Sequence, residues 1–204
     1  MELAFELFCD WYEVTHPSLR AFYGFHESQF QQIWTYKWFA KRENQIRMDA
    51  YLKKYESLFS LPEETSTELP REQKLLFDIA YIILWDQVSR NIFRNSALAY
   101  ATDKQARERV EAVMPFWKSL PFPIQITCLL VYIHSEDKAD LEIVERLLKD
   151  LEPSFRNFPS IEKALKGIAT NHRDRMNLFG RIPERNRFLG RPTTEAEAIY
   201  LSMF

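Results

Sequence analysis

The sequence predicts an all-α fold, a single-domain bundle of about eight helices over residues 1–204. Apolar residues recur along most of the chain at the three- and four-residue spacing of a helix, and no segment alternates with the period of two that is typical of a strand. Only 4 glycines are present, and 46% of the residues are hydrophobic. A chain of 204 residues can bury one sizeable core and is short for two domains.

The first third of the chain predicts three helices and a linker. Residues 2–13 carry apolar side chains at helical spacing, and the proline that follows limits this helix, while residues 18–25 predict a loop. Aromatic and aliphatic residues continue the helical spacing over residues 28–59, with a break expected at residues 41–44. Residues 61–70 are rich in Pro, Glu and Thr and predict a linker between elements.

Residues 75–95 form the predicted centre of the bundle. The first half of this segment is apolar on every side, which is typical of an interior helix. The second half carries Asp86, Arg90 and Asn91 in line with core positions, and a carboxylate can pair with a guanidinium four residues away on a helix. Because such side chains are seldom buried without partners, the segment predicts polar partners elsewhere in the chain.

Amphipathic spacing resumes over residues 102–118, and Pro121 and Pro123 open a further helix over residues 124–133. The polar residues 134–137 allow two interpretations. Ser135 caps a new helix that includes residues 141–151, or one long helix passes straight through.

The C-terminal part of the chain carries clear helix signals. Residues 160–179 predict a helix that Gly180 ends, because glycine readily adopts the left-handed conformation of a C-terminal cap. Residues 182–192 predict an irregular connection. Thr194 and Glu197 then form a capping box that opens the last helix.

Charge and cysteine content exclude several classes of protein. A formal net charge of −2 argues against nonspecific nucleic-acid binding, and two isolated cysteines, Cys9 and Cys128, suit a reducing compartment. The N-terminus lacks the basic region of a secretory signal. Every apolar run is far shorter than the roughly 20 residues that span a bilayer. We therefore expect a soluble, cytoplasmic protein with no membrane or nucleic-acid partner.

Two further segments combine helical context with dense polar residues, residues 132–142 and 171–191. The second holds six arginines but few acidic residues, and this surplus favours contacts with carboxylates, phosphates or an acidic partner. The candidate ligand-binding residues are Asp86, Arg90, Asn91, His134, Ser135, Glu136, Asp137, His172, Arg181, Arg185, Asn186 and Arg191.

These segments carry motifs in a fixed order: LWDQVSRNIFR (84–94), ATD (101–103), HSEDKAD (134–140) and FGRIPERNRFLGR (179–191), followed by Thr194 and Glu197. From residue 75 onward the chain resembles the DUF924 family, an uncharacterised group whose fold is described as TPR-like helical. The resemblance implies a TPR-like arrangement and no established activity. The chain departs from the usual family pattern at Glu184, where the family usually has histidine, and at Val88 and Ser89, where it usually has Phe-Pro.

The leading functional hypothesis is a helical binding module, in which the candidate residues converge on one polar, arginine-rich cleft for an anionic small molecule or an acidic peptide. Arginines would hold the anion, asparagines would orient it and carboxylates would position the arginines: respectively Arg181, Arg185 and Arg191; Asn91 and Asn186; Asp86 and Glu136. The same residues also suit an internal network of ion pairs that fixes helix packing.

An alternative is a hydrolase or transferase that uses His134 or His172 as a general base, although either residue also suits a hydrogen-bonded core histidine. No nucleophile lies at a recognisable spacing, and there is no Gly-rich phosphate loop or G-x-S-x-G motif. A metal site built from these histidines with Glu136 and Asp137 lacks the common ligand spacings, so neither metal nor cofactor is expected.

A third hypothesis is a structural or interaction scaffold. It requires an exposed aromatic face in the N-terminal half, with Trp34 and Trp38 at its centre.

Overall fold

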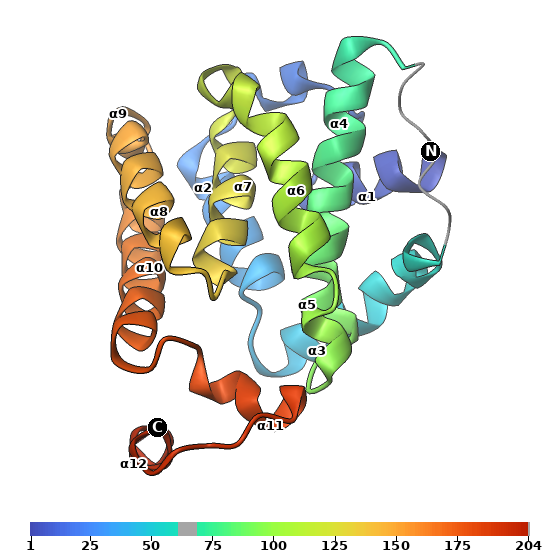
Figure 1. The fold of residues 1–204 in the computed structure, drawn as a ribbon. Helices are drawn as coiled ribbons and strands as arrows, with labels where there is room; N and C mark the ends of the chain where they lie inside the picture. The colour runs from blue at the N-terminus through green and yellow to red at the C-terminus, as the bar shows by residue number, and fades with distance from the viewer. Residues whose placement is uncertain (61–68, 204) are drawn as a thin grey trace. The chain divides into compact units, whose positions relative to one another are not determined.

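The computed structural model describes residues 1–60 and 69–203 and confirms the all-α prediction. Over these residues the chain forms α-helices joined by short 3-10 and π-helical segments, with no β-strand in this described part (Figure 1). The chain divides into two compact units, unit 1 with residues 1–94 and 98–131, and unit 2 with residues 95–97 and 132–204. The linker predicted at residues 61–70 lies outside the described residues except for its last two positions.

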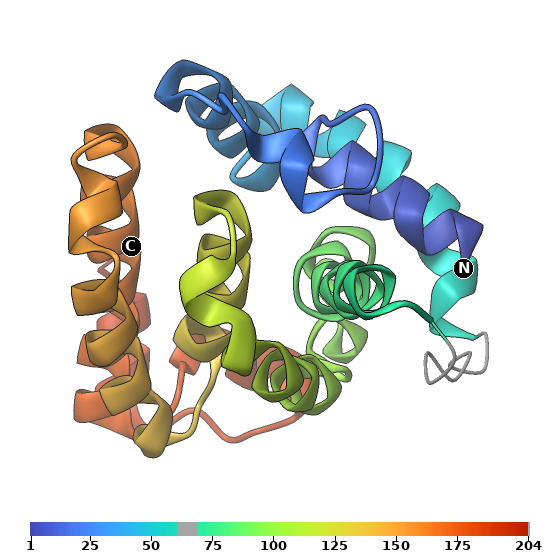
Figure 2. The same cartoon turned by 90° about the horizontal axis from the view of Figure 1, so that it is seen from above.

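Unit 1 is built around α4, which packs against α1 and α6 (Figures 1 and 2). Its helices are α1 (Glu2–Tyr12), α2 (Glu27–Ile33), α3 (Arg42–Leu52), α4 (Arg71–Ile82), α5 (Ser89–Ile92), α6 (Asp103–Val113) and α7 (Phe122–His134), the end of which belongs to unit 2.

The N-terminal predictions are confirmed in outline. Helix α1 ends at Tyr12, because Glu13 adopts a left-handed φ of 56°. The predicted loop contains one 3-10 turn, Leu19–Phe22. The break expected at residues 41–44 occurs slightly earlier, at residues 39–41, because Lys41 is extended and α3 already begins at Arg42.

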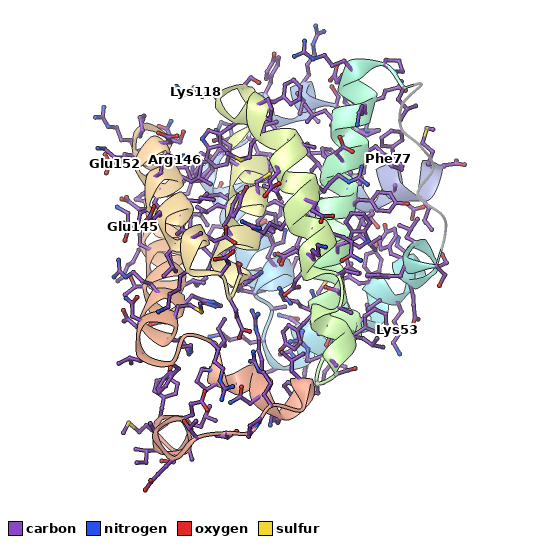
Figure 3. All side chains as sticks on the ribbon, in the orientation of Figure 1. Lys53, Phe77, Lys118, Glu145, Arg146 and Glu152 are labelled. Carbon is purple, nitrogen blue, oxygen red and sulfur yellow. The ribbon has the colours of Figure 1, made fainter. Side chains whose placement is uncertain are left out.

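The central segment is helical without a break from α4 to α5, but its hydrogen-bond pattern changes along its length. Helix α4 runs into a π-helical segment, Ile83–Val88, and then into α5. All side chains of residues 75–89 are buried, as the apolar pattern predicts. Phe77 on α4 (Figure 3) meets Phe5 of α1 edge to face, with ring centroids 6.4 Å apart. This contact is part of the core in which α4 packs against α1 in unit 1.

Aromatic residues of α1 and of the π-helical segment Trp34–Trp38, which follows α2, also lie in the core. Trp11 stacks on Trp38 with ring centroids 5.3 Å apart, and the Trp38 indole N–H donates to the Trp11 carbonyl at 3.3 Å. Trp34 and Trp38 are only 7% and 6% exposed. The aromatic residues that a scaffold hypothesis places on the surface are therefore core residues.

Unit 2 pairs two long helices, α8 and α10, which lie side by side (Figures 1 and 2). Its further helices are α8 (Lys138–Asp150), α9 (Glu152–Phe155), α10 (Pro159–Phe179), α11 (Asn186–Leu189) and α12 (Glu195–Leu201). Single-turn elements such as α9 and α11 make the helices more numerous than the sequence pattern predicts, because one turn is too short to show a period.

The polar segment 134–137 does break the helix. Helix α7 ends at His134, and Asp137 caps α8 by accepting the Ala139 amide at 2.9 Å. The expectation that Ser135 is the cap is wrong by two residues, because the Ser135 hydroxyl instead accepts the Asp137 amide at 3.1 Å. Ser135 thus shapes the turn that leads into the cap.

The C-terminal signals are confirmed. Gly180 ends α10 with a φ of 68°, and its amide donates to the Met176 carbonyl. Thr194 and Glu197 form the capping box of α12. None of the helices in the described residues is long and apolar enough to cross a membrane.

Candidate functional site

In unit 1, Asp86 and Arg90 form the ion pair that their spacing predicts. Asp86 is 1% exposed, and its Oδ1 accepts Arg90 Nη2 at 3.0 Å. The same guanidinium nitrogen donates to Asp103 Oδ1 of α6 at 2.9 Å, and Nη1 donates to the Ala99 carbonyl at 2.8 Å. Although burial opposes its charge, Asp86 and Asp103 raise the pKa of Arg90. This guanidinium is therefore held by groups of unit 1 itself.

The π-helical segment contributes acceptors to this network. The Trp85 carbonyl accepts the hydroxyls of Ser89 and Thr102, each at 2.7 Å. Gln87, inside the same segment, donates its side-chain amide to Asp86 Oδ2. Segments of this kind are rare and frequently mark functional positions, and nothing in the apolar period of the sequence signals one.

Asn91 contacts its own helix and a neighbouring arginine. Its amide nitrogen donates to the Gln87 carbonyl at 2.8 Å, and its oxygen accepts Arg94 Nη2 at 3.1 Å. Arg94 also forms a two-pronged pair with Asp49 of α3, at 2.9 and 3.0 Å. Asn91 thus helps to tie α5 to α3.

In unit 2, Glu136 accepts hydrogen bonds from Arg191, one of the arginines predicted to bind a ligand. Its carboxylate accepts Arg191 Nη1 at 2.6 Å and Nη2 at 3.1 Å, and it accepts the Ile182 amide at 2.7 Å. Burial opposes ionisation of Glu136, but the Arg191 guanidinium and the Ile182 amide lower its pKa. The arginine-rich loop therefore pairs with the acidic segment 134–137, through Arg191 and Glu136.

Arg181 and Arg185 also bind acceptors inside unit 2. Arg181 forks onto Glu197 at 2.6 and 2.8 Å and reaches the Pro192 carbonyl at 2.7 Å. Arg185 is 7% exposed and donates to the His134 carbonyl at 2.8 Å. These contacts suit residues that position the loop.

Glu197, in the first turn of α12, is a polar partner of Arg181 that the predicted site residues do not include. It is 2% exposed and accepts Asn186 Nδ2 at 3.2 Å in addition to Arg181 and the Thr194 amide. The Arg181 guanidinium lowers the pKa of Glu197 to about 2, against the cost of burial. The capping-box motif predicted Glu197 as a residue at the start of a helix and gave no indication that it also pairs with Arg181.

The two candidate histidines lie together in unit 2. The rings of His134 and His172 are 5.8 Å apart between centroids, at an interplanar angle of 51°. His172 also lines a pocket of ≈ 230 Å³ between α8 and α10. The lining of this pocket combines the aliphatic residues Ile133, Leu141, Val144, Leu148 and Ala169 with the polar residues Glu145, Lys166, Thr170, His172 and Arg173.

A second pocket in unit 2, of ≈ 460 Å³, is lined by Pro183, Glu184, Arg187, Thr193 and Leu201. Glu184 Oε1 accepts Arg175 Nε at 2.7 Å. Arg187, which is exposed, is not among the predicted site residues, because the sequence does not distinguish an arginine that has an acceptor among the described residues from one that has none there.

The predicted site residues thus form two groups, with Asp86, Arg90 and Asn91 in unit 1 and the remainder in unit 2. Within unit 2, Glu136 meets Arg191, Arg185 meets the His134 backbone, and Asp137 is a helix cap. Convergence of both groups on one cleft stays a prediction. Among the described residues, no group of three or more His, Cys, Asp or Glu is arranged to hold a metal ion.

Comparison with known proteins identifies a family without an assigned activity. The family model described as "Bacterial protein of unknown function (DUF924)" matches residues 17–203. No curated protein matches the chain. A solved structure described as a protein of unknown function from Agrobacterium tumefaciens is similar over 100% of this chain and 98% of that chain, with 22% identity and a TM-score of 0.58, a likeness that concerns the fold alone. The chain belongs to the DUF924 family of bacterial proteins of unknown function.

Proposed function

We propose that unit 2 is a binding module for a small amphipathic anion, held in the pocket between α8 and α10. The observation that carries the proposal is the composition of this pocket, whose lining combines aliphatic residues with two cations, Lys166 and Arg173. An apolar cavity with a few convergent polar groups is the usual form of a small-molecule site. At ≈ 230 Å³ the pocket is below the usual range for drug-sized ligands, so it favours a small molecule over a peptide.

The two cations of this lining are in solvent-exposed ion pairs that a ligand anion can replace. Arg173 lies 3.6 Å from Glu145 on α8 (Figure 3) and 3.9 Å from Asp174, and its side chain is 43% exposed. Lys166 pairs with Glu162 one turn away at 2.6 Å and is 48% exposed. Exposed pairs of this kind contribute at most about 1 kcal/mol, so exchanging them for a ligand anion costs little.

In this proposal the loop arginines have a positioning role. Arg181, Arg185 and Arg191 bind Glu197, the His134 carbonyl and Glu136. They hold the segment that follows α10, and the ligand anion is held by the cations of α10.

Octanoate tests the proposal, with 1-octanol as the neutral probe of the same length. We expect octanoate to raise the melting temperature of the parent protein more than 1-octanol does. Replacing Thr170, an exposed lining residue, by Phe should fill the pocket and abolish the shift. The double variant K166Q/R173Q should bind octanoate about tenfold more weakly, because hydrogen bonds to charged groups contribute about 1.5 kcal/mol or more.

Lys163→Gln is the matched control, because Lys163 is exposed on the same helix and does not line the pocket. It should leave octanoate binding unchanged. Equal stabilisation of T170F and the parent protein by octanoate, or the absence of any shift in the parent, contradicts the proposal.

A second candidate function is an acid–base enzyme, favoured by the position of His172 in the lining of this pocket beside the ring of His134. Its imidazole would activate water against a bound ester. Hydrolysis of p-nitrophenyl butyrate that disappears in H172Q, while octanoate binding is retained, would establish it. Equal rates in both proteins exclude it.

A further inference from the structure

The lining of the ≈ 460 Å³ pocket in unit 2 includes residues of opposite charge, Glu184 and Arg187. Glu184 and Arg187 are three residues apart on the helical turn that runs from Pro183 into α11, a spacing that brings side chains to one side of a turn. No ion pair joins them. The partner of Glu184 is Arg175, whose Nε lies 2.7 Å from Glu184 Oε1.

Glu184 has one oxygen that lacks a donor. Oε1 is bonded to Arg175, whereas Oε2 is buried and has no hydrogen-bond partner among the described residues. Native structures rarely leave a buried acceptor in this state, because a buried polar atom without a hydrogen bond costs about 1–3 kcal/mol. An oxygen of this kind in a pocket lining is suited to a ligand that donates.

The guanidinium of Arg187 has N–H groups that are available to a ligand. Its guanidinium stacks over the ring of Phe188, 4.4 Å from the centroid, and makes no ion pair with any described residue. The stacked face leaves the N–H edges of the guanidinium directed outward in its own plane, where a carboxylate can accept two of them. The other arginines of this loop, by contrast, are bonded to acceptors of unit 2.

We propose that this pocket binds a small zwitterion with the chemistry of an amino acid. The ligand ammonium donates to Glu184 Oε2, and the ligand carboxylate accepts from Arg187. A simple anion would be repelled by the Glu184 carboxylate, and a simple cation would leave Arg187 without a ligand acceptor. Only a ligand with both charges can bond to both side chains. Pro183 and Leu201 supply apolar contact for a side chain, and the volume lies within the usual range of ligand pockets.

Blocked amino acids test each contact separately. Calorimetric titrations would use L-leucine, L-glutamate, L-lysine and glycyl-L-leucine as zwitterions, with N-acetyl-L-leucine and L-leucinamide as probes that lack one charge. We expect at least one zwitterion to bind and each blocked leucine to bind about tenfold or more weakly than L-leucine, from the loss of one charge-assisted hydrogen bond. Preference for glycyl-L-leucine over the free amino acids assigns the ligand to peptides, and the reverse preference assigns it to free amino acids.

Two substitutions assign the contacts. Arg187→Gln should remove the preference for L-leucine over L-leucinamide, and Glu184→Gln should remove the preference over N-acetyl-L-leucine. Arg187 is exposed, so R187Q should keep the melting temperature of the parent; Glu184→Asp supplies a second carboxylate variant if loss of the Arg175 pair unfolds E184Q. Thr170→Phe, in the other pocket, should change none of these affinities. Failure of every zwitterion to bind, or equal binding of the blocked leucines by the parent protein, overturns the proposal.

Discussion

The guanidinium of Arg181 forks onto the carboxylate of Glu197, with Nε 2.6 Å from Oε1 and Nη2 2.8 Å from Oε2. The same carboxylate accepts the Thr194 amide at 2.7 Å in the capping box of α12. One buried side chain thus both starts the last helix and fixes the segment that follows α10. The folding of α12 is therefore tied to the loop that carries Arg187.

The double role of Glu197 predicts a graded loss of order in α12. Thr194→Ala removes only the side-chain cap and should cost about 1 kcal/mol. Glu197→Ala removes the capping acceptor together with the partner of Arg181, so it should lose more amide protection in α12 than T194A does. Hydrogen exchange of residues 195–201 measures both. Equal protection in the two variants would show that the Arg181 pair adds nothing to the cap.

Glu197 also predicts an acid-dependent loss of stability. Its ordinary pKa is 4.5, and Arg181 lowers it to about 2 in the folded protein. Because the unfolded chain binds this proton first, the pair stabilises the folded state fully above the ordinary pKa, and this stabilisation is lost as the pH falls toward about 2. The lowered pKa of Glu136 acts in the same direction.

Urea denaturation at successive pH values from 6 downward measures this dependence. Arg181→Gln should flatten the acid limb of the stability profile, because it removes the main cause of the low pKa of Glu197. Arg94→Gln breaks the pair with Asp49 in unit 1 and leaves Glu197 untouched, which makes it the control. An acid limb as steep in R181Q as in the parent would contradict the assignment.

The Asp86–Arg90 pair predicts a large effect in unit 1. Arg90→Gln breaks the ion pair of Arg90 with the Asp86 carboxylate, which is 1% exposed, and loss of one partner of a buried pair costs about 3–5 kcal/mol. Adding Asp86→Asn should recover part of this loss, because the buried negative charge disappears. Lys104→Gln on α6 breaks an exposed pair with Glu108 and should cost at most about 1 kcal/mol. Equal urea midpoints for R90Q and K104Q would contradict a large contribution of the buried pair to stability.

The sequence predicted the helices best where the signal is local. The capping box at Thr194 and the C-terminal cap at Gly180 depend on a few adjacent residues, and both are confirmed. The π-helical segment Ile83–Val88 was not predicted. A run that is apolar on every side has the same sequence pattern whether its backbone hydrogen bonds are α-helical or π-helical. The choice of Asp137 over Ser135 as a cap depends on where the turn closes, and both residue types are good caps.

For the site, the sequence identified charged residues but not their partners. Arg191 does meet Glu136, as the opposite charges of the two segments suggested. Arg185 instead donates to a backbone carbonyl, and every residue of the chain carries such an acceptor, so composition gives no signal for it. Arg187 is exposed and has no hydrogen-bond acceptor among the described residues, whereas Arg181, Arg185 and Arg191 each have one, and this difference arises only in the folded loop. Pocket linings likewise depend on how α8 and α10 pack.

Glycine positions in and after α10 supply the last prediction, in which one substitution has opposite effects at two sites. A Cβ added at Gly167, inside the helix, meets no atom within 4 Å, so Gly167→Ala should stabilise the protein by about 0.5–1 kcal/mol through the lower backbone entropy of the unfolded chain. A Cβ at Gly180 also meets no atom within 4 Å, but its φ of +68° is left-handed, and Gly180→Ala should destabilise by about 1–2 kcal/mol. Urea midpoints of the two variants measure the difference. A rise in the midpoint of G180A would contradict the assigned C-terminal cap, and a fall in that of G167A would show that the helix interior at Gly167 is not free to accept a side chain.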